Sequence, residues 1–149
     1  MTEQYTLLRE QLKALVEGVP HPIANLSNAS ALIMDSLPDL NWAGFYLLEG
    51  NTLVLGPFQG KPACITISVG RGVCGTAVKE DATQLVPDVH AFPGHIACDC
   101  ASRSEIVVPL HKDGNVVAVL DIDSPTAGRF TLEDQEGLEA LVPILESAF

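Results

Sequence analysis

The chain is short of basic residues. It carries 8 lysines and arginines against 19 aspartates and glutamates, which gives a formal net charge of −11. Nucleic-acid binders need a basic patch that neutralises phosphates and releases their counterions. Anionic membranes attract the same kind of patch. We therefore expect neither nucleic acid nor a membrane surface as a partner.

Long apolar runs are also missing. No stretch of the sequence is apolar enough for a membrane span, and the first residues, Met1 to Tyr5, lack the basic and apolar regions of a secretion signal. We expect a cytoplasmic protein. The 149 residues contain no repeat or linker and match the size of one domain with one core. The sequence thus predicts a single domain over residues 1–149.

Cysteine is absent from both ends of the chain. All four cysteines lie between Cys64 and Cys100. In a reducing compartment, cysteines are more often catalytic, metal-binding or buried than structurally cross-linked. The clustering indicates thiol chemistry at one place, and it leaves those three roles open.

The hydrophobic periodicity predicts an α+β fold, with a central, mainly antiparallel sheet of about six strands flanked by N-terminal and C-terminal helices. A loop is expected over residues 86–104, and Pro143 should kink the last helix. The apolar stripe of the first helix is expected at Leu8, Leu12, Leu15 and Val16, and that of the second at Ile23, Leu26, Ile33 and Leu37. Helices are expected at 6–18, 22–37, 73–80 and after Thr131, and strands at 42–48, 52–58, 64–68, 84–86, 105–111 and 116–123.

Two acids, Asp121 and Asp123, end an otherwise apolar strand and share one of its faces. Unpaired buried carboxylates are costly, so a functional role is expected for both. A hairpin with a two-residue loop would set Glu105 opposite Ile122, on the other face. A longer loop or an equivalent bulge would set Glu105 opposite Asp123, and a single three-acid site requires that shift.

Two aromatic residues, Trp42 and Tyr46, share a strand face with Gly44 between them. A hollow at the glycine would suit a small apolar group or a sulfonium-like centre. Packing of both rings in the core is the equally weighted alternative.

The four thiols divide by their surroundings. Cys98 lies in the long loop with His95 three residues earlier, which favours an exposed, activated thiol. Cys74 follows an apolar residue in a predicted helix and is expected to pack as a small hydrophobe. Cys64 could be either a packed residue or a reactive thiol. The Cys98-Asp-Cys100 spacing is too short for the usual zinc pair, so zinc is the weaker alternative and we expect no metal. A disulfide inside that tripeptide would be strained.

Six ordered motifs resemble those of the free methionine-(R)-sulfoxide reductases, a family of single GAF-type domains. The resemblance covers essentially the whole chain from Asn41 onward and implies a single GAF-like domain. The motifs are Asn41-Trp-Ala-Gly-Phe-Tyr46, Gly56-Pro-Phe-Gln-Gly-Lys-Pro-Ala-Cys64, Gly70-Arg-Gly-Val-Cys-Gly-Thr76, Val86 through Cys98, Ser104-Glu-Ile-Val-Val-Pro109 and Asp121-Ile-Asp-Ser-Pro125.

The resemblance implies a role for each thiol. Cys98 would attack the sulfoxide sulfur and become a sulfenic acid, and Cys64 would condense with it to a disulfide that thioredoxin reopens. Cys74 matches a third family cysteine whose role is less settled. Cys100 is a departure from the family pattern and puts the identity of the resolving thiol in doubt.

The resemblance also implies roles for the acids and aromatics. Glu105 with Asp123 would hold or donate the proton that the departing oxygen needs, and Asp121 would bind the substrate ammonium. Trp42 and Tyr46 would cradle the S-methyl group. No cofactor is implied. GAF domains often dimerise through a helix like the first one here, which makes a second copy of the chain a candidate partner. The alternatives are a non-catalytic GAF sensor of a small ligand and a thiol-based redox or metal sensor.

Overall fold

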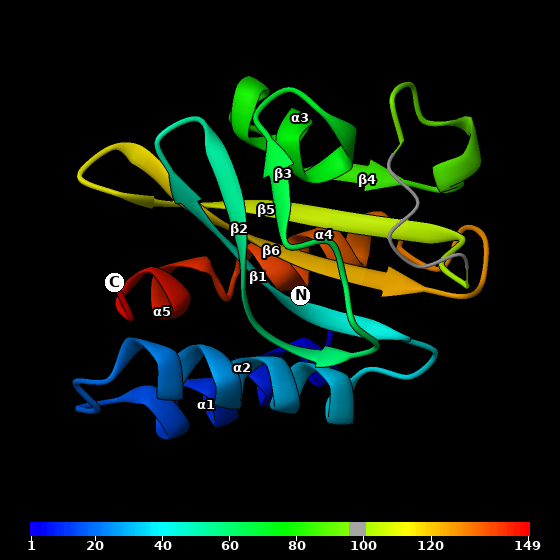
Figure 1. The fold of residues 1–149 in the computed structure, drawn as a ribbon. Coiled ribbons are helices and arrows are strands. Elements are labelled where there is room, and N and C mark those ends of the chain that lie inside the picture. Colours follow the sequence, from blue (N-terminus) through cyan, green and yellow to red (C-terminus); the bar gives the residue numbers. More distant parts are fainter. Residues whose placement is uncertain (96–100) are drawn as a thin grey trace.

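The computed structural model spans residues 1–149, and the structure describes residues 1–95 and 101–149. Figure 1 shows the fold as a sheet with helices on both sides. Its elements are α1 (Glu3–Val16), α2 (Pro22–Ser36), β1 (Trp42–Glu49), β2 (Thr52–Gly60), β3 (Thr66–Ser68), α3 (Gly72–Glu80), β4 (Gln84–Val86), the 3-10 turn η1 (Val89–Ala91), β5 (Ser104–Lys112), β6 (Asn115–Ser124), α4 (Leu132–Glu139) and α5 (Val142–Glu146).

Six strands of the described chain form one antiparallel sheet in the order β3-β2-β1-β6-β5-β4. The predicted fold class is therefore confirmed. The two central strands, β1 and β6, come from opposite ends of the sheet region of the chain, so residues near 42 and 123 become neighbours. Helices α1 and α2 lie side by side on one side of the sheet, and α3 lies on the other (Figure 1).

Each face of the sheet has its own apolar cluster, because successive side chains of a strand point to opposite faces. Helices α1, α2, α4 and α5 cover the first face, here called the helix face. The second face, here called the site face, lies under α3. From strands β1, β5 and β6, the helix face buries Ala43, Phe45, Ile106, Val108, Leu110, Ala118, Leu120 and Ile122. The site face buries Trp42, Tyr46, Val107 and Val119 from the same strands, with Cys74 from α3.

The predicted helices exist, and their buried stripes differ in detail. Leu8, Leu12 and Val16 are buried in the chain's own core, whereas Leu15 is 41% exposed. Three of the four residues of the predicted α1 stripe are thus used inside the domain, and Leu15 is left exposed on the outer side of the helix. In α2, Ile23 is 72% exposed at the first turn, and the buried side is completed by small and polar residues such as Ala29 and Ser30.

The C-terminal segment forms two helices in place of one kinked helix. The helix expected after Thr131 is α4, and Thr131 caps it in a capping box with Asp134. Ala140 and Leu141 separate α4 from α5, and Pro143 lies in the first turn of α5. A proline lacks the N–H that continues a helix but fits the first turn of a new one, so the chain restarts at this point.

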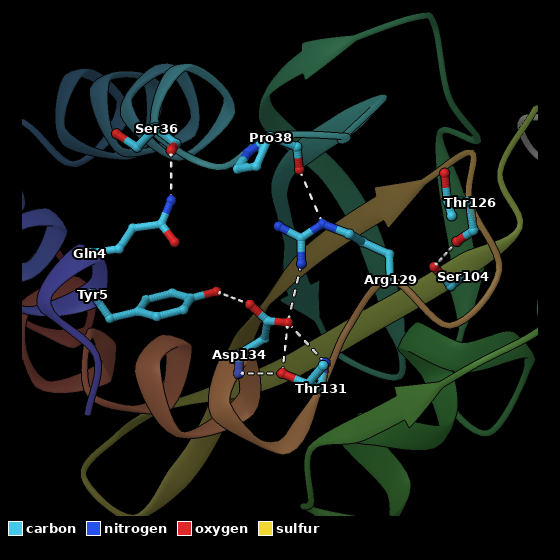
Figure 2. Close-up of polar contacts among 9 residues, drawn as sticks. All are labelled: Gln4, Tyr5, Ser36, Pro38, Ser104, Thr126, Arg129, Thr131 and Asp134. Carbon is cyan, nitrogen blue, oxygen red and sulfur yellow. Dashed lines mark hydrogen bonds and ion pairs between the residues drawn. The ribbon is translucent and has the colours of Figure 1, made fainter.

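A polar network ties the two ends of the chain together (Figure 2). The Tyr5 hydroxyl of α1 donates to Asp134 Oδ1 of α4 at 2.6 Å. Arg129 donates to the other Asp134 oxygen at 3.1 Å and to the carbonyl of Pro38, also at 3.1 Å. Both Asp134 oxygens therefore have buried or half-buried donors, which compensates for removing this carboxylate from water.

None of the helices in the described ranges 1–95 and 101–149 is long and apolar enough to cross a membrane.

Candidate active site

Three strands bring together the acids of the site face. In the sheet register, Asp123 lies opposite both Trp42 of β1 and Glu105 of β5. Asp121 lies one row further along, opposite Gly44 and Val107. Directly opposed side chains of an antiparallel pair are about 5 Å apart at Cβ, so the three carboxyls form one cluster.

A bulge in β6 sets this register. The hairpin turns tightly at Asp113 and Gly114, with Lys112 paired to Asn115, and this two-residue loop alone would have put Glu105 on the wrong face. The register shifts by one between Leu110 and His111, where Val117 is the extra residue of β6. The equivalent bulge that a three-acid site requires is therefore present.

Burial controls the protonation of the acids. Glu105 is 8% exposed and Asp121 is 5% exposed. Burial raises the pKa of Glu105 well above its usual value, and the charges of Asp121 and Asp123 raise this pKa further. Burial also raises the pKa of Asp121, although hydrogen bonds from Glu105 and Cys74 oppose that increase. Burial and the neighbouring carboxylates therefore favour the protonated form of Glu105.

Asp121 retains an unused acceptor. Its Oδ1 atom is buried and accepts no hydrogen bond from any residue in the described parts of the chain. A buried carboxylate oxygen without a donor is costly. The site is thus suited to a ligand that brings a cationic N–H donor to this atom.

Cys74 belongs to the acid cluster. It is a buried free thiol, as expected, but its Sγ lies 4.0 Å from Glu105 Oε2. Burial raises the pKa of this thiol well above its usual value, and the three nearby carboxylates raise it further. Cys74 is therefore held as a protonated thiol, because a thiolate here would be both desolvated and repelled.

The glycine-rich start of α3 places Cys74. A Cβ at Gly75 would lie 2.5 Å from the carbonyl oxygen of Ser68, so only glycine allows α3 to approach β3 this closely. Gly70 and Gly72 have positive φ angles of 89° and 60°, which turn the chain sharply into the helix. This packing brings the thiol over the sheet beside Glu105.

The aromatic pair lines the cavity without the predicted hollow. Trp42 and Tyr46 stack with ring centroids 6.0 Å apart, and Trp42 also stacks on Phe58 at 5.1 Å. A Cβ at Gly44 would lie 2.3 Å from the Phe58 Cβ. The expectation of a ligand hollow at Gly44 is therefore wrong, because the neighbouring strand β2 occupies that space. Both rings are in the core and border the site, so the two alternatives are not exclusive.

A cavity of about 50 Å³, lined by both polar and apolar side chains, lies above these residues. His95, already placed beside Cys98 in the sequence, also lines it, and burial lowers the pKa of its imidazole. Ser102 lines it too, although nothing in the sequence around it indicated this role. The lining comprises Trp42, Tyr46, Ala63, Ile67, Gly72, Val73, Cys74, His95, Ser102, Glu105, Asp121 and Asp123.

Of the remaining thiols, Cys64 lies among the described residues. Cys64 is half-buried, packs against the site-face cluster and is disulfide-bonded. Cys98 and Cys100, the expected nucleophile and the additional thiol, lie outside the described residues.

One group of side chains in the described ranges could hold a cation. Ligand atoms of Cys74, Glu105 and Asp121 lie within 4.8 Å of one another. Metal ligands must be deprotonated, so a cation would have to displace both the thiol proton and the proton shared by the acids. The same protons make the cluster suitable for acid catalysis.

The fold and the position of the cavity identify the class of domain. The GAF domain family model matches residues 10–149, which is nearly the whole chain. The antiparallel sheet with helices on both sides and a cavity on one face is thus a GAF domain.

Three similar proteins show to which family of GAF domains the chain belongs. The chain is 58% identical to the free methionine-R-sulfoxide reductase of Escherichia coli (strain K12) over 145 residues, covering 97% of this chain and 88% of that protein. It matches the structure of fRMsr of Staphylococcus aureus in complex with substrate, with a TM-score of 0.92, 58% identity and coverage of 97% and 94%. It also matches the free methionine-R-sulfoxide reductase of Neisseria meningitidis in complex with its substrate, with a TM-score of 0.94, 42% identity and coverage of 100% and 92%. The chain belongs to the free methionine-(R)-sulfoxide reductase family of oxidoreductases.

Proposed function

We propose that this protein reduces free methionine (R)-sulfoxide to methionine with Cys98 as the nucleophile. The observation that carries the proposal is the row formed by Trp42, Asp123 and Glu105 across three strands, in which burial raises the pKa of Glu105. A sulfoxide oxygen leaves only when it is protonated, and a carboxylic acid with a raised pKa is suited to supply that proton.

The first step transfers the oxygen to the enzyme. The Cys98 thiolate attacks the sulfoxide sulfur and forms an S–S bond, while the Glu105–Asp123 pair supplies one proton to the oxygen. The hydroxyl then passes to the Cys98 sulfur as the S–S bond and the S–O bond of the substrate break. Methionine leaves and Cys98 becomes a sulfenic acid, so the sulfoxide is reduced by two electrons and the thiolate is oxidised by two.

Substrate recognition uses the other groups. The Asp121 carboxylate, with its unused Oδ1 acceptor, binds the substrate ammonium. The rings of Trp42 and Tyr46 pack against the S-methyl group, where a positively polarised sulfur also favours an aromatic face. A free amino acid has the ammonium that a peptide-bound residue lacks, which supports selection of the free substrate.

The second step regenerates the enzyme. The Cys64 thiol condenses with the Cys98 sulfenic acid, releasing water and forming a disulfide, and thioredoxin then reduces that disulfide by exchange. The presence of Cys64 in a disulfide and its position beside the site-face cluster support this role. The thioredoxin step needs a reducing compartment, so the proposal places the protein in the cytoplasm.

The activity is tested by incubating the reduced protein with each epimer of free methionine sulfoxide and dithiothreitol and measuring methionine by chromatography. We expect the (R) epimer alone to be converted and Cys98→Ser to be inactive. Absence of product from both epimers would contradict the proposal and favour a ligand sensor.

The resolving thiol is tested with thioredoxin as reductant. We expect Cys64→Ser to produce about one methionine per protein and then stop, because its sulfenic acid has no partner, while Cys100→Ser keeps turning over. Continued turnover of Cys64→Ser would assign resolution to Cys100 or Cys74.

We further propose that the protein is a homodimer. The inward side of α1 is buried, but Leu7 and Leu15 on the same helix are 59% and 41% exposed. Large apolar side chains left exposed on one helix are consistent with coverage by a second copy. Light scattering should give twice the 15.8 kDa chain mass, and the Leu7→Glu, Leu15→Glu double variant should give one chain mass.

A further inference from the structure

The segment that carries Cys64 has little structure of its own. Residues 61–65 connect β2 to β3 and belong to neither strand. Lys61, Pro62 and Ile65 are exposed, so the segment is not held by burial of large side chains. Besides the disulfide and the packing of Cys64 against the site face, contacts with the backbone of the segment fix the position of Cys64.

Two of these contacts come from the aromatic pair of β1. The Trp42 indole N–H donates to the Lys61 carbonyl at 3.1 Å, and the Tyr46 hydroxyl donates to the Cys64 carbonyl at 2.8 Å. A third bond, from the Leu55 N–H to the Ile65 carbonyl at 2.9 Å, ties the end of the segment to β2. The Tyr46 bond acts on the cysteine itself.

Both donors stand on a rigid base. Trp42 and Tyr46 are each 2% exposed and stack on one another, and Trp42 is also stacked on Phe58. Gly60 completes the base, because a Cβ there would lie 2.6 Å from the Trp42 ring. The polar tips of the two rings thus point at one backbone segment from a fixed position in the sheet.

We propose that the Tyr46 hydroxyl and the Trp42 indole N–H are positioning groups that hold Cys64 for disulfide formation. The proposal rests on the proposed function, in which Cys64 is the resolving thiol. The two rings contact the substrate in the first step, and their hydroxyl and N–H groups hold the Cys64 segment during the second step, disulfide formation. In that second step the Cys64 sulfur attacks the Cys98 sulfenic sulfur, the S–O bond breaks and water leaves.

The expected change in the rate of disulfide formation follows from how strongly a reaction between two cysteine side chains of the protein depends on their relative position. A misplacement of about 1 Å can cost on the order of 100-fold in rate. Removing the hydroxyl frees the Cys64 carbonyl without changing the thiol. We therefore expect disulfide formation to slow by about 10-fold to 100-fold in Tyr46→Phe.

The test isolates the second step from substrate binding. The reduced protein is treated with one equivalent of hydrogen peroxide, which oxidises the Cys98 thiolate to the sulfenic acid and is itself reduced to hydroxide. The sulfenic acid is then followed by trapping with dimedone, and mass spectrometry confirms its location and the disulfide that replaces it. In Tyr46→Phe the trapped fraction should persist longer than in the wild type by the stated factor.

Tyr5→Phe is the matched control. It also removes a buried tyrosine hydroxyl, which donates to Asp134 on the helix face, remote from the segment. Its sulfenic acid should disappear at the wild-type rate even though the protein is less stable. A general loss of stability would slow both variants equally and would contradict the proposal.

A second variant keeps the test decisive if Tyr46→Phe does not fold. Trp42→Phe removes the Lys61 bond while retaining an aromatic ring, and it should slow disulfide formation by a smaller factor because Lys61 is three residues from Cys64. Wild-type rates in the folded variants would overturn the positioning role. Wild-type decay in Cys64→Ser would instead overturn the resolving role of Cys64, so the two failures are distinguishable.

Discussion

The two faces of the sheet are built from the same strands and have opposite chemistry. On β5, Glu105 faces the site and the next residue, Ile106, faces the helices. On β6, Asp121 and Ile122 alternate in the same way. The helix face contains aliphatic side chains in close contact, whereas the site face contains acids, a thiol and aromatic rings around a cavity.

The difference shows how the fold separates stability from chemistry. Burial of a large aliphatic side chain stabilises the folded state by about 1.5–3 kcal/mol. A buried carboxyl that must ionise destabilises it, since the charged form loses its hydration. Aliphatic burial on the helix face therefore offsets the destabilisation that the buried acids of the site face cause. Mutations on the site face should mainly lower activity, whereas mutations of neighbouring residues on the helix face should mainly lower the free energy of unfolding.

The largest expected effect is on activity at the site face. Glu105→Gln removes the proton donor but keeps the size of the side chain, so kcat/KM for methionine (R)-sulfoxide should fall by roughly 100-fold to 10,000-fold. Steady-state assays with dithiothreitol measure this change. Ile106→Val, at the next position, is the control and should retain activity near that of the wild type. A Glu105→Gln variant with wild-type kcat/KM would remove Glu105 from the chemistry.

A large effect on stability is expected from the helix face. Leu120 is fully buried between the sheet and the helices, so Leu120→Ala should lower the free energy of unfolding by about 2–5 kcal/mol through lost burial and a residual cavity. Urea denaturation measures the loss. Leu120→Met preserves volume and should cost less than about 1.5 kcal/mol. A loss in Leu120→Ala no larger than in Leu120→Met would mean that this face is loosely packed.

The acids of the site face should impose a pH dependence on stability. The raised pKa of Glu105 means that the folded state binds its proton more tightly than the unfolded chain, where the pKa is about 4.3. Its contribution is therefore fully present below about pH 4.3 and is lost as pH rises through the folded-state pKa.

Glu105→Gln cannot ionise and should show a smaller decrease in the free energy of unfolding between pH 5 and pH 8 than the wild type. Paired denaturation curves at the two pH values measure the difference. Equal slopes would show that Glu105 is already ionised in the folded protein.

The smallest expected effect is on stability and concerns His111, which links the end of α3 on the site face to α5 on the helix face. His111 of β5 accepts or donates hydrogen bonds with Asp81 at the end of α3 and with Glu146 of α5, the latter at 3.3 Å. The hydrogen bond with Asp81 is the main cause that raises the pKa of the imidazole, against an opposing effect of burial. The stabilisation is present below about pH 6.5 and is lost as pH rises through the folded-state pKa.

His111→Gln should therefore lower the free energy of unfolding by about 0.5–1 kcal/mol at pH 6, a small value because Asp81 is largely exposed to solvent. The variant and the wild type should converge near pH 9. A difference that is the same at both pH values would indicate lost packing in place of lost charge pairing. Urea denaturation at each pH provides the measurement.

Much of the fold could be predicted because periodicity in the sequence is local. The alternation from Trp42 to Leu48 assigned each residue to the correct face, and the capping role of Thr131 also follows from neighbouring residues. Two of the errors concern contacts between distant segments. Exposure of Ile23 depends on where α2 meets the sheet, and the occupied space at Gly44 depends on the approach of Phe58 from β2.

The sequence by itself determined the fold class, the family resemblance and the residue types available for chemistry, because these follow from local patterns and motifs. Only the tertiary structure decided how the acids meet. One extra residue at Val117 turns Glu105 toward Asp123, and the packing of α3 brings Cys74 beside them. Burial then sets their protonation, since the loss of hydration that keeps the proton on Glu105 arises only when the separate strands and α3 enclose the same space.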